Sequence, residues 1–239
     1  MNKADQIKIY KNLSLIRKTQ EEIVDRYHPA DKMKCPMHFC IGQEMTPAVL
    51  NPLMIKEDSI YSHHRSHGYF ISKKGPIREM IAEFYGKITG TNGGLAGSQE
   101  LSSSKINFYS GTILSGAFAM ALGDAYEKNY SKKKGIAISV IGDGGMTAGM
   151  SFEAMCHAGY LKKDILVVLN DNEMSISPNV GALNKYLTRL LTAIKKKGNK
   201  LLDEKNPIKK IAKAIKDNTQ NILKPVSYTH LTLPTMFEV

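Results

Sequence analysis

The chain has 239 residues and a mass of 26.5 kDa, with 42% hydrophobic and 23% charged residues, which fits a globular protein that can bury a core. No apolar run approaches the roughly 18 residues of a membrane span. No apolar segment follows the charged start, and three cysteines are too few for a disulfide framework. We therefore exclude secreted, membrane-spanning, fibrous and disordered classes and expect a cytoplasmic protein. The net charge of +11 is distributed unevenly.

Apolar spacing predicts three helices in the first half of the chain. Apolar residues recur every three or four positions from Asp5 to His28, and shorter helical patterns run from Glu44 to Met54 and from Ile77 to Tyr85. The glycine- and serine-rich segment between Gly86 and Ser115 has little capacity to form a core, so we predict a long loop there. A helix of small residues, Gly116 to Tyr126, follows and can pack closely on a sheet.

The next passage alternates strands with a helix. It contains a strand at 136–141, the turn Gly-Asp-Gly-Gly, a helix from Met146 to Tyr160 and a strand at 164–170. Two strands joined by a crossover helix form a right-handed parallel unit. We therefore predict an α/β fold, a doubly wound parallel sheet with helices on both faces, within a domain that spans residues 1–193.

A basic segment follows this predicted domain. Between Ile194 and Lys224 there are ten lysines and three acidic residues, so the segment carries +7 of the net charge. Isoleucines at helical spacing predict a basic amphipathic helical extension over 194–225. Because no aromatic residues interleave with the lysines, we favour a solvated helix over a nucleic-acid-binding or membrane-binding surface.

Two polar turns follow the predicted strands, at the ends where doubly wound sheets bind ligands. The first turn, 142–145, contains glycines that let backbone N–H groups approach a diphosphate closely. The second turn contains Asn172 and Met174. A carboxylate from Asp143, an amide oxygen from Asn172 and the backbone carbonyl of Met174 predict a Mg²⁺ site that phosphate oxygens complete.

The Gly-Asp-Gly sequence, with an Asn 29 residues after its Asp, resembles the thiamine-diphosphate motif. The resemblance implies a thiamine-diphosphate-binding fold, with thiamine diphosphate and Mg²⁺ as cofactors. It implies Asp143, Asn172 and Met174 as metal ligands, and it implies cofactor contacts from Gly142, Gly144, Gly145 and Asn172.

Residues 8–141 resemble the alpha subunit of thiamine-dependent 2-oxo acid dehydrogenases of the pyruvate and acetoin type. The matching segments are MHFCIGQE (37–44), HHRSHGYFISKKG (63–75), AEFYGKITG (82–90) and NFYSGTILSGA (107–117). The resemblance implies that His64 and Arg65 contact the diphosphate, since a guanidinium can bind phosphate through paired hydrogen bonds. It implies that His38 faces the substrate, and we add His67 as a second candidate catalytic residue. The turn near the aminopyrimidine corresponds to Thr112, Leu114 and Ser115.

Residues 142–225 instead resemble deoxyxylulose-phosphate synthase, a family of isoprenoid biosynthesis. The segments GDGGMTAGMSFEAMCHAG (142–159) and VVLNDNEMSISPNVGALNKYLTRLL (167–191) carry this resemblance. The GHQ and GHSS segments of that family are missing upstream, although His38 matches an active-site histidine there too. The change of resemblance near Gly142 leaves open that the chain is a chimera.

The last segment, 226–239, contains VSYTHLTLPT, which resembles the translation of a sequencing adapter. We therefore predict an artefactual tail there and leave it out of the fold.

Some residues also have ordinary structural explanations. The HHxxH pattern at 63–67 is compatible with zinc, but no fourth ligand follows at a suitable spacing. Cys156 lies among Ala and Met, so we expect it to be a small core residue. We expect Glu44 to stabilise the N-terminus of a helix through its negative charge.

The glutamate that activates thiamine diphosphate lies, in both families, on a pyrimidine-binding domain that this sequence does not contain. We therefore expect a beta subunit or missing C-terminal domains to supply it, in a dimer or heterotetramer that acts on a small 2-oxo acid. Our first expectation is a dehydrogenase alpha subunit that decarboxylates the acid and transfers the acyl unit. The alternatives are the N-terminal fragment of a synthase that condenses pyruvate with glyceraldehyde 3-phosphate, and a truncated or chimeric fragment without activity.

Overall fold

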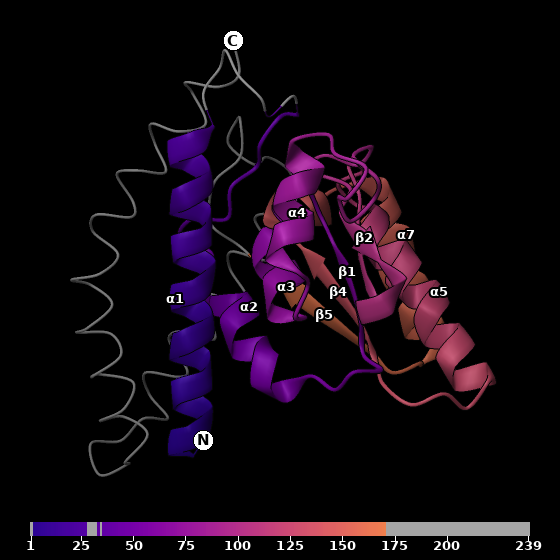
Figure 1. The fold of residues 1–239 in the computed structure, drawn as a ribbon. Coiled ribbons are helices and arrows are strands. Elements are labelled where there is room, and N and C mark those ends of the chain that lie inside the picture. Colours follow the sequence, from indigo (N-terminus) through magenta and orange to yellow (C-terminus); the bar gives the residue numbers. More distant parts are fainter. Residues whose placement is uncertain (1, 28–32, 34, 171–239) are drawn as a thin grey trace. The chain divides into compact units, whose positions relative to one another are not determined.

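A five-stranded sheet forms the centre of the computed structural model, which describes residues 2–27, 33 and 35–170 (Figure 1). Its strands are β1 (Ser59–Ser62), β2 (Ser102–Ser103), β3 (Phe108–Ser110), β4 (Ala137–Ile141) and β5 (Ile165–Leu169), in the order β2-β3-β1-β4-β5. Strands β3, β1, β4 and β5 are parallel, whereas β2 pairs antiparallel with β3. The predicted α/β fold is therefore confirmed, with one correction: the antiparallel edge makes the sheet mixed.

A short turn produces this antiparallel edge. The 3₁₀ turn η2 (Ser104–Ile106) is followed by Asn107, whose φ of 52° is left-handed, and the chain reverses so that Ser103 lies opposite Phe108. The segment between Gly86 and Ser115, predicted as a loop, therefore contains two strands. Because these strands have only two and three residues, they leave no alternating pattern that sequence reasoning can detect.

Four helices cover one face of the sheet: α1 (Lys3–Arg26), α2 (Met45–Leu50), α3 (His67–Ser72) and α4 (Ile77–Phe84) (Figure 1). The side chain of Asn2 caps α1 by accepting a hydrogen bond from the N–H of Asp5 at 2.8 Å. Fully buried side chains from these helices and from β1 and β3 form the main core, among them Ile16, Phe70, Phe84, Ile60 and Phe108. The helices predicted near 5–28, 44–54 and 77–85 are thus confirmed, although the second ends at Leu50 and continues as a 3₁₀ turn.

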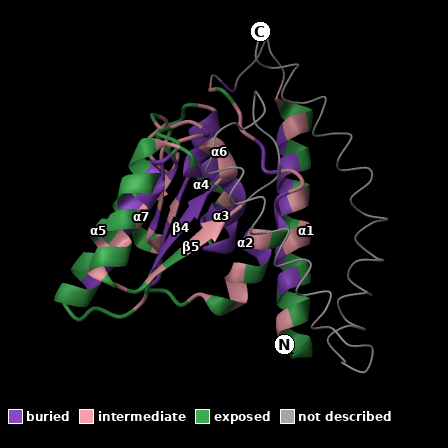
Figure 2. Cartoon of the chain, turned by 180° about the vertical axis from the view of Figure 1, so that it is seen from behind, coloured by how far each residue is buried: buried purple, intermediate pink, exposed green. Residues whose placement is uncertain are grey.

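Helices α5 (Gly116–Tyr130) and α7 (Gly149–Leu161) cover the other face. Ala121 and Ala125 of α5 pack on Ala137 of β4, so small side chains let this helix approach the sheet closely, as predicted. Figure 2 shows that the outward sides of α5 and α7 are largely exposed.

The helix predicted from Met146 to Tyr160 is divided in two. Helix α6 (Asp143–Met146) begins at the aspartate, and α7 begins only after Ala148, whose ψ of 147° is extended. Asp143 and the two glycines after it therefore lie within a helical turn directly after β4.

All described residues belong to one compact unit, Met1–Ser177. The predicted boundaries at 193 and 225, the basic extension and the tail lie outside the described residues and stay predictions. Within residues 2–27, 33 and 35–170, no helix has both the length and the apolar character needed to cross a bilayer.

Candidate functional site

The carboxyl ends of four parallel strands meet at one edge of the sheet. Strand β1 is central, and the chain passes from β1 to β3 on one side and then to β4 on the other. In open α/β sheets, ligands bind beyond the carboxyl ends of the strands at such a switch point. Strand β1 is followed here by residues 63–65, and β4 by residues 142–145. Two of the predicted cofactor-binding segments are therefore neighbours at the switch point.

Close backbone packing joins the 142–145 turn to the segment before α5. A Cβ added to Gly145 would lie only 2.8 Å from the carbonyl oxygen of Leu114, so no larger residue fits there without a shift. The hydroxyl of Ser151 donates a hydrogen bond to the carbonyl of Gly145 at 2.9 Å. Ser115 is buried at the start of α5. The structure thus brings together the predicted residues Leu114, Ser115 and Gly145.

Other predicted residues of this edge are more accessible. Gly142, Asp143 and Gly144 are half-buried at the tip of β4. Thr112 is exposed, and its hydroxyl donates to the carboxylate of Glu100 at 2.9 Å. The proposed metal ligands Asn172 and Met174 lie outside the described residues, so the metal site stays a prediction.

Asn170, which sequence analysis did not select, connects the tip of β5 to the start of α2 and the residues just before it. Its backbone N–H donates to the carbonyl of Ile141 at 2.8 Å. Its side-chain amide donates to Oε1 of Gln43 at 2.8 Å and accepts from the hydroxyl of Thr46 at 3.2 Å. Gln43 and Thr46 carry no sequence signal for this contact, because they are more than 120 residues from their partner.

The segment before α2 is itself held by an ion pair. The carboxylate of Glu44 lies 2.6 Å from Nε of Arg17 in α1 and accepts hydrogen bonds from the N–H of Gly42. The hydrogen bond from Glu44 raises the pKa of Arg17. Glu44 is the N-cap residue of α2, as expected, and because its side chain makes no capping hydrogen bond there, its carboxylate is available to fix the preceding loop.

The turn after β1 places two neutral histidines, His63 and His64, beside Arg65. The rings of His38 and His64 are 4.9 Å apart, and those of His63 and His64 are 5.2 Å apart. Burial lowers the pKa of His64 to about 3 and that of His63 to about 4, with further lowering from Arg65. Nη1 of Arg65 donates to the carbonyl of Phe39 at 2.8 Å, which orients the guanidinium. The positive charge of this turn therefore comes from Arg65.

His67 lies in the core at the start of α3. It is fully buried, with Nδ1 3.2 Å from Oε1 of Gln20 and Nε2 2.9 Å from the hydroxyl of Ser98, and burial lowers its pKa to about 4. This placement corrects our expectation, because a histidine whose two ring nitrogens are engaged inside the core is not positioned to meet a substrate.

His38 is half-buried, and its ring is held by a residue from the glycine-rich segment. The side-chain nitrogen of Gln99 lies 3.0 Å from Nδ1 of His38, and the hydroxyl of Ser98 accepts from the backbone N–H of His38 at 3.3 Å. Among the described residues, no three His, Cys, Asp or Glu side chains are grouped so that they could hold a metal ion.

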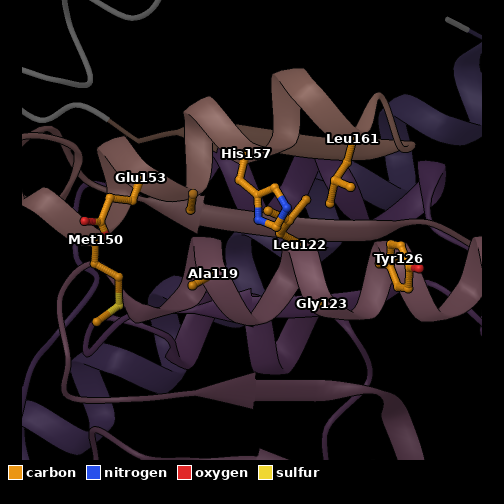
Figure 3. Close-up of a pocket in the computed structure, with 9 residues that line it drawn as sticks. Ala119, Leu122, Gly123, Tyr126, Met150, Glu153, His157 and Leu161 are labelled. Atoms are coloured by element: carbon orange, nitrogen blue, oxygen red, sulfur yellow. The ribbon is translucent and has the colours of Figure 1, made fainter.

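A groove between α5 and α7 lies apart from these residues (Figure 3). Its lining comes only from those two helices and includes Leu122, Tyr126, Met150 and His157. None of the predicted site residues lines it. Cys156 on α7 is exposed, which corrects the expectation of a core residue; the low overall burial of this helix is the reason.

Comparisons with known proteins support one of the two resemblances. Residues 85–238 match the family model of 1-deoxy-D-xylulose-5-phosphate synthase. Curated relatives of that name include proteins from Alteromonas mediterranea (51% identical over 122 residues, 49% of this chain and 19% of the relative) and Shewanella sediminis (49% over 122 residues, 49% and 19%). The relative from Pasteurella multocida is 45% identical over 135 residues, 54% of this chain and 20% of its own length. The chain thus spans about a fifth of the length of the curated relatives it matches.

Proposed function

This chain belongs to the 1-deoxy-D-xylulose-5-phosphate synthase family, and on that premise we propose that it forms the diphosphate-binding N-terminal region of a thiamine-dependent synthase. The reaction joins pyruvate to glyceraldehyde 3-phosphate and releases CO₂. The match favours the second of the three expected functions, and the dehydrogenase alpha subunit that we placed first gains no support from it.

The chemistry of the switch point fits the diphosphate of this cofactor. Arg65 supplies a permanent cation, and Asp143 supplies a carboxylate at the neighbouring strand tip. Nδ1 of His63 accepts from the backbone N–H of Arg65 at 3.2 Å, so its proton is on Nε2. This buried Nε2–H has no hydrogen-bond partner among the described residues. Because a buried donor without an acceptor is costly, an anion in this turn would stabilise it.

When bound, thiamine diphosphate supplies the nucleophilic carbon and the electron sink for decarboxylation. Arg65 would bind and orient the diphosphate, and Asp143 would hold Mg²⁺ together with phosphate oxygens. The neutral state of His63 and His64 keeps these rings available as hydrogen-bond donors and acceptors rather than as charges. Close packing of Gly145 against Leu114 keeps the turn rigid, which lowers the cost of ordering it around a ligand.

The observation that carries this proposal is that Arg65 and Asp143 follow the carboxyl ends of the neighbouring strands β1 and β4, in a chain of this family. It is tested by calorimetric titration of the intact chain with thiamine diphosphate in the presence of Mg²⁺. We expect binding that Asp143→Asn weakens strongly and that Arg65→Lys weakens by about tenfold, because lysine cannot bind phosphate through two parallel hydrogen bonds. The control is Asp164→Asn, an exposed carboxylate just before β5. Equal binding by wild type and Asp143→Asn contradicts the assignment.

We further propose that the activating glutamate comes from a pyrimidine-binding domain or subunit outside the residues of this chain. The full reaction is accordingly proposed for the longer protein, because the curated relatives are about five times as long as the stretch they share with this chain. The pairing of β5 with β4 and the hydrogen bond from Asn170 to Gln43 join the two stretches that resemble different families. These contacts favour one continuous domain over an inactive chimeric fragment.

A further inference from the structure

Glu83, near the end of α4, holds a tight glycine-rich loop around its carboxylate. The residue is 1% exposed and accepts four backbone hydrogen bonds. Oε2 receives the N–H groups of Asn92 and Gly94 at 2.7 and 2.9 Å, and Oε1 receives those of residues 96 and 97 at 2.6 and 3.3 Å. One carboxylate oxygen therefore holds the residues on both sides of Gly93.

Gly93 lies between these two hydrogen bonds in a conformation that favours glycine. Its φ is 70°, and its own N–H donates to the carbonyl of Gly90 at 3.1 Å. The side chain before it belongs to Asn92, whose Oδ1 accepts from the N–H of Ser102 in β2 at 3.0 Å. Asn92 and Gly93 form the single Asn-Gly pair of the sequence.

An Asn-Gly pair can modify itself by deamidation. The backbone nitrogen of the glycine loses its proton and attacks the side-chain amide carbon of the asparagine, so a ring closes. The bond from that carbon to the amide nitrogen breaks, and the nitrogen leaves as ammonia with the proton. Water then opens the ring at either carbonyl and leaves aspartate or isoaspartate. Glycine favours the attack because it has no Cβ to shield the nitrogen, so the φ that requires glycine at 93 also creates the reactive pair.

We propose that Asn92 is a site of spontaneous deamidation and that Glu83 keeps this site closed. The attack needs the amide proton of Gly93, which is bonded to the carbonyl of Gly90. It also needs the side chain of Asn92 to leave the N–H of Ser102. The hydrogen bonds from residues 92 and 94 to Glu83 oppose both movements, so the reaction proceeds only when the loop opens locally.

The product would disturb the loop that contains it. Isoaspartate adds a methylene group to the main chain between residues 92 and 93, so the N–H groups on the two sides of the insertion no longer fit one carboxylate. The loop continues to Ser98, whose hydroxyl lies 2.9 Å from Nε2 of the buried His67. Modification at Asn92 should therefore loosen a contact of the main core.

Peptide mapping by mass spectrometry tests the proposal on the intact chain without cofactor. The chain and a synthetic peptide of residues 87–98 are incubated side by side at neutral pH, and the deamidated fraction at Asn92 is followed over time. Wild type should react more slowly than the peptide by the protection factor of the Gly93 amide in hydrogen exchange, because both reactions need the same opened N–H. Asn107, which precedes the bulky Phe108, is the internal control and should stay unmodified.

Glu83→Gln should raise the rate of deamidation by about tenfold, because it turns one oxygen into a donor that faces two backbone N–H groups. Glu79→Gln is the matched control, since Glu79 is an exposed carboxylate on the same helix. It should react at the rate of wild type.

Two results overturn the proposal. One is a wild-type rate that departs from the protection factor by more than about tenfold in either direction. The other is an equal rate in wild type and Glu83→Gln. If Glu83→Gln does not fold, the comparison of wild type with the peptide still decides. Thiamine diphosphate takes no part in this measurement, so failure of the proposed function would leave these rates unchanged.

Discussion

The two faces of the sheet are built in different ways. The face under α1 to α4 buries large side chains such as Phe70, Phe84 and Phe108, together with His67. The face under α5 rests on alanines, and its outer helix α7 has only two buried residues, Ser151 and Ala154. Stability should therefore depend on buried area on the first face and on close fit on the second. The candidate catalytic residue His38 and the loop that holds it border the deeper face, where a fixed geometry is easier to maintain.

The largest expected effect is the dependence of the free energy of unfolding on pH. It comes from buried histidines on the face covered by α1 to α4, here called the deep face. His63 and His67 are buried, with pKa values of about 4 in the folded chain, whereas an unfolded histidine titrates near 6.5. Between these values the unfolded state binds more protons, so the free energy of unfolding falls as pH decreases from 6.5 to 4. Each histidine contributes roughly 3 kcal/mol to this loss.

Urea unfolding measured at pH 7 and pH 5 checks this dependence. His67→Gln should flatten the slope of stability against pH, and His157→Gln, at an exposed position of α7, should not. A wild type equally stable at both pH values would show that these rings are not buried in neutral form.

The next largest loss of stability should come from removing an aromatic ring from the core of the deep face. Phe70 is fully buried and meets Phe108 edge to face, with ring centroids 5.4 Å apart. Phe70→Ala should lower the free energy of unfolding by about 3–5 kcal/mol, because it removes buried area and leaves a cavity. A loss below 1 kcal/mol in chemical denaturation would mean that the deep face is not a packed core.

Replacing a small side chain by a larger one should destabilise the protein most on the face covered by α5, which packs through alanines. Ala121 is fully buried between α5 and the sheet, so Ala121→Leu has no space and should cost about 1–3 kcal/mol through displacement of the helix. The same denaturation measurement applies, with Ala119→Leu on an exposed side of α5 as the control. Equal stability of the two variants would contradict close packing at Ala121.

The smallest effect is expected in the groove between α5 and α7. Met150 is 44% exposed there, so Met150→Ser should change the stability of the isolated chain by less than about 0.5 kcal/mol. A loss comparable with that of Phe70→Ala would show that the second face is as deeply packed as the first.

The same contrast explains what sequence reasoning could predict. Strands β4 and β5 were predictable, because five consecutive apolar or small residues bounded by turns are typical of buried parallel strands. Strand β1 was missed because its four residues, Ser-Ile-Tyr-Ser, present no apolar run. The turn at 142–145 follows from glycines and an acid after a strand.

The contacts that hold the site were not predictable, for a physical reason. Glu83 acts on backbone N–H groups, which every residue except proline carries, so the sequence predicts a loop there but does not show which side chain organises it. The contact of Asn170 with Gln43 depends on the order of strands in the sheet rather than on local spacing.

The central claim is that Arg65 from the β1 end and Asp143 from the β4 end act on one magnesium–diphosphate group. A double-mutant cycle of Arg65→Gln and Asp143→Asn, read as affinity for thiamine diphosphate with a fixed Mg²⁺ concentration, tests it most directly. Groups that share a ligand should be coupled by at least about 1 kcal/mol, so the double variant should lose less affinity than the two single losses combined. Losses that add to within about 0.3 kcal/mol would contradict the claim, because they would show that the two residues act at separate places.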